Sequence, residues 1–118
     1  MIGSVVTAKH SDDYRQLMAQ QKFLHDIEQG IRIANREIIH ERLPTITEDM
    51  VLKFAVTVSR FRADYLESAF KMIIEGGSLP GADVMTELSE RRETYLLARN
   101  AFDALQMAIE RGYVDLDL

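Results

Sequence analysis

A few residues of this 118-residue chain combine types and a spacing that could support chemistry. Glu37 and His40 form a Glu-x-x-His pair, which on a helix can direct a carboxylate and an imidazole toward one metal ion. Helical di-iron proteins use two such pairs with two further glutamates, so this chain would need a second copy to complete the site. Ile38, between them, is the expected core position, so Glu37 lies at the edge of the core and His40 lies further out. The alternative interpretation of this candidate metal site is therefore a solvated helix face.

Arginines form a second candidate site. Arg91, Arg92 and Arg99 make the densest basic group in the chain, and Arg91 falls on an apolar row of its expected helix. An arginine that faces a helical bundle can bind an anion, or it can extend its aliphatic stem along apolar surface and pair with a carboxylate. The group therefore predicts either an anion site in a ligand-binding or enzymatic bundle, or structural ion pairs.

His25 followed by Asp26 is similar to the phospho-accepting histidine of histidine phosphotransfer domains, which resemble this chain in size and helical class. Those domains usually continue with lysine and glycine, whereas Glu28 and Gln29 stand at the corresponding positions here. Histidine phosphotransfer is an alternative function on this resemblance. The other interpretation is an exposed histidine beside a core position.

Composition narrows the classes of function. The chain has no cysteine, which excludes disulfide scaffolds, thiol nucleophiles, zinc knuckles and iron–sulfur clusters, and we expect no cofactor. The net charge is −5. Residues 1–44 carry 6 basic and 6 acidic groups, 45–77 carry 4 and 5, and 78–118 carry 4 and 8. Since no segment is net basic, nucleic-acid binding is disfavoured, and the acidic last third suits a basic protein partner.

The distribution of apolar residues predicts a cytoplasmic protein. Residues 1–8 are apolar but too short for a signal peptide and have no basic segment before them. No uncharged stretch approaches the roughly 20 residues that cross a bilayer. We therefore expect no membrane association.

Proline and glycine divide the chain into three segments of helical periodicity. Pro44 stops the first helix, Gly76-Gly77 stops the second, and Gly112 follows the third. Ser11 and Asp83 are the expected N-caps of the first and third helices, and Thr45 to Glu48 reads as a capping box for the second. The chain is predicted to be one helical domain with an N-terminal arm over 1–10, helices over about 12–43, 46–75 and 84–111, and a C-terminal tail over 112–118.

Each predicted helix carries an apolar residue at every seventh position. The rows are Leu17, Leu24, Ile31 and Ile38; Val51, Val58, Tyr65 and Met72; and Leu88, Tyr95, Phe102 and Ile109. A repeat of seven favours nearly parallel axes with coiled-coil-like packing, and short connections make neighbours antiparallel. The predicted fold is all-α, an antiparallel up-down-up bundle of three long helices.

The middle helix has a second apolar row, well round from the first, so more of it is apolar than two neighbouring helices require. An exposed row of this length would promote association. The sequence therefore predicts a homodimer through the second helix, with an interface made of Leu52, Val56, Ala63, Leu66, Phe70 and Ile73. The alternative is a loose bundle in which the N-terminal arm or the C-terminal tail covers this row.

These features together favour a non-enzymatic helical interaction module, such as an adaptor, a chaperone or an antiactivator. Leu43-Pro44 ahead of a long helix, and Gly112-Tyr113-Val114 after another, are similar to the same features of the dimeric helical antiactivators of quorum-sensing regulators. The resemblance covers the last two helices and implies a dimer that binds another protein. The alternative is a ligand-binding or enzymatic helical bundle with its site at the dimer interface.

Overall fold

The computed structural model of the chain describes residues 2–75 and 79–118. Within them the protein is mostly helical, which confirms the all-α class. The elements, in chain order, are α1 (Ile2–Arg42), β1 (Ile46–Thr47), α2 (Glu48–Glu75), α3 (Ala82–Glu110) and β2 (Leu116–Asp117).

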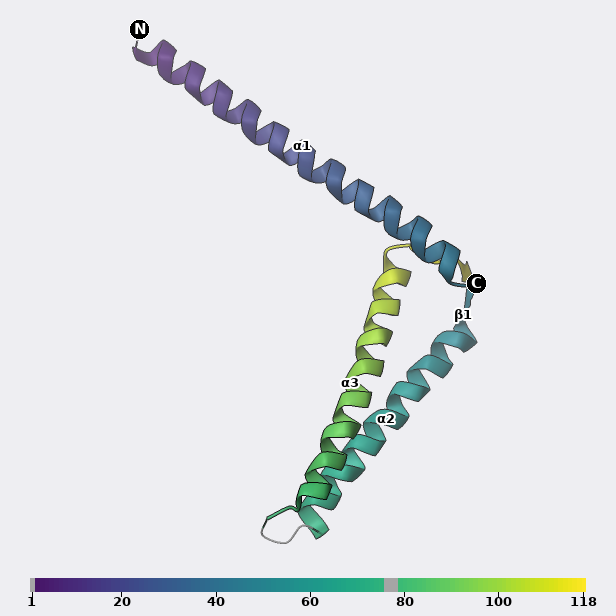
Figure 1. The fold of residues 1–118 in the computed structure, drawn as a ribbon. Coiled ribbons are helices and arrows are strands. Elements are labelled where there is room, and N and C mark those ends of the chain that lie inside the picture. The colour runs from purple at the N-terminus through teal and green to yellow at the C-terminus, as the bar shows by residue number, and fades with distance from the viewer. Residues whose placement is uncertain (1, 76–78) are drawn as a thin grey trace.

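The molecule is extended rather than compact. Helices α2 and α3 lie side by side in opposite directions as a hairpin, and α1 projects from one end of it, so that the two parts meet like the arms of an L (Figure 1). The radius of gyration is 25.4 Å. A compact domain of this length would have a radius of about 13–14 Å. The bundle predicted from the sequence is thus only partly found, because α1 does not pack along α2 and α3.

The α2–α3 hairpin uses the rows that the sequence analysis predicts. The rings of Phe54 and Phe102 lie 5.5 Å apart between centroids, and those of Tyr65 and Tyr95 lie 6.0 Å apart. From Phe54 to Tyr65 the residue number on α2 rises, while that of the contacting residue on α3 falls from Phe102 to Tyr95. This order is that of an antiparallel pair of helices. Val58 is buried in the same seam. Aromatic pairs at these distances add to the energy of burial.

The start of α2 differs from its predicted start by two residues. Helix α2 begins at Glu48, and the backbone amide of Met50 donates a hydrogen bond of 3.2 Å to the hydroxyl of Thr47. Thr47, and not Thr45, is therefore the capping residue. The reason is that Ile46 and Thr47 are extended, because they pair with the C-terminal strand, so the helix cannot begin before them.

The other helix ends show smaller differences. Helix α3 begins at Ala82 behind Gly81, so Asp83 lies in the first turn instead of capping it, where its charge still suits the helix dipole. Helix α1 includes residues 2–10, which the sequence analysis assigned to an arm. No proline separates them from the rest of α1, and extending an existing helix costs far less than nucleating one. The predicted stop at Gly76-Gly77 lies outside the described residues.

The buried core lies at the junction of the helices. It consists of Ile46 from β1, Ala108 from α3, and Tyr113 and Val114 from the tail, against which Ile39 of α1 packs. Gly112, at φ 72°, turns the chain out of α3. This left-handed conformation strains residues that have a Cβ. The tail thereby reaches the connection between α1 and α2.

Backbone and side-chain bonds hold the tail in place. Strands β1 and β2 pair in parallel, with Ile46 opposite Leu116, and the amide of Ile46 donates to the carbonyl of Asp115 at 2.8 Å. The side chain of Asp115 also pairs with His40 on α1. The last turns of α1, the connection and the tail therefore form one unit.

Across residues 2–75 and 79–118, no helix has the length and apolarity needed to cross a membrane.

The junction core predicts a specific sensitivity to substitution. Ile46→Ala removes the most central side chain of a core that has few members, so we expect a loss of about 2–4 kcal/mol in the free energy of unfolding. Urea denaturation followed by circular dichroism measures this loss. Leu118→Ala is the matched control, because Leu118 is fully exposed, and it should change stability by less than about 0.5 kcal/mol. Equal effects of the two substitutions would contradict the assigned core.

Candidate functional site

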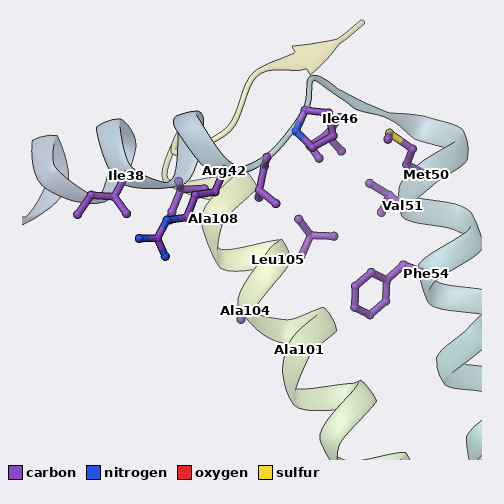
Figure 2. A pocket seen from close by; sticks show the side chains of 13 residues that line it. Ile38, Arg42, Ile46, Met50, Val51, Phe54, Ala101, Ala104, Leu105 and Ala108 are labelled. Carbon is purple, nitrogen blue, oxygen red and sulfur yellow. The ribbon is translucent and has the colours of Figure 1, made fainter.

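A large apolar cavity lies at the junction of the three helices. It encloses about 580 Å³ and is open to solvent on one side. Figure 2 shows Ile38 and Arg42 of α1, Val51 and Phe54 of α2, and Ala101 and Leu105 of α3 around it. Apart from the guanidinium of Arg42, these side chains are apolar. The cavity exists because α2 and α3 diverge toward this end (Figure 1) and α1 does not fill the space between them.

Two further hollows follow the cavity along the hairpin, and the three together are the groove between α2 and α3. Lys53, Phe54 and Thr57 of α2 and Ala98 of α3 line the nearer of these hollows. Further still, a small hollow of about 60 Å³ is polar and includes Ser68 and Arg91. The groove therefore changes from apolar at the junction to charged at the far end, and this gradient fixes the kind of surface that can fill it.

The predicted row of α1 is uncovered along its length. Leu17, Leu24, Ile27, Ile31 and Ile38 are 47–59% exposed. Between residues 10 and 42 of this helix, only Asn35 and Ile39, close to the junction, are partly buried. The surface at Gly30 is open as well, because a Cβ added there would have no neighbouring atom within 4 Å. The row that was expected to form the third side of a bundle core is therefore available to another molecule.

The second row of α2 is also uncovered. Leu52, Val56, Leu66, Phe70 and Ile73 are 42–68% exposed, and Ala63 between them is exposed as well. Because α3 covers the opposite face of α2, where Val58 and Ser68 are buried, the row is left uncovered by residues 2–75 and 79–118. Its assignment as the contact between two copies stays a prediction.

The arginines do not converge. Arg91 lies in the small polar hollow, whose walls include Asp64, Glu67 and Glu87. Arg99 lies near Asp103, at 3.9 Å, on an exposed part of α3, and Arg92 is exposed. The three therefore do not form one anion site in a single chain, since an α-helix turns neighbouring side chains to different sides. The carboxylates around Arg91 fit the ion-pair alternative.

Tyr95 forms the best-defined polar contact of the hairpin. The Nε of Arg62 donates a hydrogen bond of 3.1 Å to the Tyr95 hydroxyl, and the guanidinium lies 5.4 Å from the centre of the ring. The hydrogen bond from Arg62 is the main reason why the pKa of Tyr95 falls below its ordinary value of 10.0; burial opposes it, and Arg99 acts in the same direction. This contact fixes the register of α2 against α3, and the sequence analysis did not identify it.

The predicted metal pair has a different arrangement from a metal centre. Glu37 and His40 lie on an exposed face of α1, and the Nε2 of His40 contacts the carboxylate of Asp115. Among the described residues there is no group of three or more side chains suited to hold a metal ion. The tail is thus the partner of His40, which links the histidine to the junction core.

His25 lies on the exposed part of α1. Its neighbour Asp26 forms an ion pair of 3.7 Å with Lys22. This pair spans one helical turn on the surface and is worth only a few tenths of a kcal/mol.

The tail residues were missed as site residues. Tyr113 and Val114 are buried at the junction, and the pKa of Tyr113 is lowered, first by a hydrogen bond from Asn35 of α1 and then by one from Arg111. The only signal in the sequence is an aromatic and a β-branched residue directly after Gly112. That pair indicates a packed tail but does not say what it packs against.

Comparison of the chain with protein-family models, with curated proteins and with solved structures finds no match.

The contact between Arg62 and Tyr95 can be measured by titration. Arg62→Gln should raise the pKa of Tyr95 toward its ordinary value of 10.0, because the main stabilising donor to the phenolate is weakened. Arg99→Gln should raise it less, and Arg92→Gln should leave it unchanged. Nuclear magnetic resonance of labelled tyrosine reports the pKa of each ring. An unchanged pKa in Arg62→Gln would show that this hydrogen bond does not form in solution.

Proposed function

We propose that this chain is a non-enzymatic helical protein–protein interaction module and that it acts as a homodimer. The observation that carries the proposal is the exposed apolar row on α1, a helix of 41 residues. Over residues 10–42, where its burial is described, only Asn35 and Ile39 in the last turns are partly buried. Isolated helices in water gain little from their own sequence and are usually stabilised by packing an apolar face. Such a helix is best explained as one that packs against a partner.

The accessible surface supports the same proposal. The single chain exposes 9762 Å². A compact monomer of this mass would expose about 6,500 Å². The excess of about 3,200 Å² per chain exceeds the 800 Å² or so that each partner buries in an interface of standard size. Most of the exposed large apolar side chains lie on α1 and α2, and exposed apolar patches are typical of surfaces that associate.

A further partner of basic character fits the charges. On α3 and the tail, Asp83, Glu90, Glu93, Glu110 and Asp117 are exposed. We propose that the homodimer uses this acidic surface to bind a basic protein, as an adaptor, chaperone or antiactivator would. Complementary charge of this kind mainly accelerates and selects the encounter.

The second candidate function is ligand binding at the junction. The cavity of about 580 Å³ lies within the range of small-molecule sites, and Arg42 supplies a cation at its wall. These properties suit an apolar molecule with an acidic group. The wide opening of the cavity favours the first proposal, because a site for a small molecule usually encloses most of its ligand.

Sedimentation velocity tests the homodimer. At micromolar concentration we expect a single species of twice the chain mass that dissociates on dilution, because the apolar rows are covered only in the pair. Circular dichroism on the same samples should show α1 losing helix as the dimer dissociates. A monomer across the whole range, with unchanged helix content, would contradict the proposed homodimer.

A further inference from the structure

The uncovered row of α1 and the groove of the hairpin are continuous with each other. Ile38 is the last member of the row and also lines the junction cavity, so the row runs outward from the mouth of the groove. One surface is a projecting apolar ridge, and the other is a hollow between two helices. Ridges packing into grooves is the general way in which helices associate.

The chain's own α1 cannot fill its own groove while the tail stays in place. The last turns of α1 are tied to the tail through His40 with Asp115 and through Ile39, which packs against the core that contains Tyr113. The tail is in turn paired with β1. Folding α1 back along the hairpin would break these contacts and expose the core around Ile46. A helix that fills the groove must therefore come from a second molecule.

The lengths of the two surfaces match. Residues 10–38 of α1 span about 43 Å at 1.5 Å per residue. Helices α2 and α3, of 28 and 29 residues, span about 42 and 44 Å on the same rise. One α1 can therefore cover a whole hairpin.

The L shape permits a symmetric exchange. Figure 1 shows α1 and the hairpin as the two arms of the L. If a second copy is placed by a two-fold axis that bisects the angle between these arms, α1 of each chain is superimposed in direction on the hairpin of the other. Each α1 then lies along the hairpin of the other chain, and both contacts are equivalent, as a closed dimer requires. Two three-helix bundles result, each made of α1 from one chain and α2 and α3 from the other.

Polar residues agree with this register. Gln20 is the polar residue between Leu17 and Leu24 in the α1 row. It lies about 33 Å along α1 from the junction, at 1.5 Å per residue. Ser68 and Arg91, in the polar part of the groove, lie about 30 and 29 Å out on the same rise. The one polar position of the α1 row, Gln20, thus falls opposite the polar hollow, and Ile31 and Ile38 fall opposite apolar lining.

We propose that the groove between α2 and α3 is the binding site for α1 of a second copy of this chain, so that the dimer forms by exchange of α1. This inference rests on the proposed homodimer and specifies its contact. It replaces the contact predicted through the second row of α2, which the exchange leaves outside the interface.

Cysteine crosslinking tests the exchange directly, because the chain has no cysteine of its own. Ala34 on the α1 row and Ala101 at the cavity lie at similar distances from the junction, about 12 and 14 Å along their helices. Variants Ala34→Cys and Ala101→Cys are mixed after equilibration and treated with a short bis-maleimide. We expect a covalent dimer that contains one chain of each variant. Arg36→Cys, on the opposite side of α1, is the matched control and should give little product with Ala101→Cys.

Two interface variants complete the test, with sedimentation velocity and circular dichroism on each. Ile31→Glu places a charge in the exchanged contact, so the dissociation constant should rise roughly 30-fold or more. The double variant Leu66→Glu with Phe70→Glu alters only the second row of α2 and should leave the dimer intact. Because Ile31 is exposed in the single chain, its substitution should not unfold the hairpin.

The outcomes separate this inference from the proposed function. If the protein is a dimer that lacks the mixed crosslink and is dissociated by Leu66→Glu with Phe70→Glu, the exchange is wrong and the homodimer stands through α2. A crosslink within one chain of the double variant Ala34→Cys with Ala101→Cys, found in monomers, would also overturn the exchange, because α1 would then fold back. If the unmodified protein is a monomer, both proposals fail.

Discussion

The packing of the C-terminal tail against the connection between α1 and α2 is the constraint on which the shape of the molecule depends. Tyr113 and Val114 bury themselves beside Ile46, and the short parallel ladder holds the tail in register. Alone, such a two-residue ladder would be marginal, since it has an edge on both sides. It persists because Ile46 also belongs to the core, together with Tyr113 and Val114 just ahead of the ladder, and it directs α1 away from the hairpin.

That direction determines what the seven-residue repeats do. On α2 and α3 they form the seam that contains Phe54, Phe102 and Tyr95, while on α1 the same kind of repeat stays exposed. A repeat specifies that a helix packs along another helix with a small crossing angle. It does not specify which molecule supplies the other helix. The choice between an internal and an external partner is made by the junction, through residues that belong to no repeat.

The parts of the fold that follow from local rules could be predicted from the sequence, and the parts that depend on distant contacts could not. Pro44 ends α1, and the seam of the hairpin follows from spacing alone. The shift of the helix cap from Thr45 to Thr47 could not be predicted, because it results from pairing with residues about seventy positions away. The same holds for the candidate sites. Arg91 and Arg99 are close in sequence, yet their surroundings differ because they meet different parts of α2 and α3.

The proposed exchange of α1 would cover two of the apolar surfaces that the single chain leaves open. In a dimer built by exchange, both the α1 row and the groove become covered, whereas the second row of α2, with Leu66 and Phe70, and the acidic surface of α3 stay accessible. The pair would then present two copies of each free surface, related by the two-fold axis. Two linked copies bind a divalent partner more tightly than either does alone. Dimerisation and partner binding can therefore use separate surfaces, so that the second does not compete with the first.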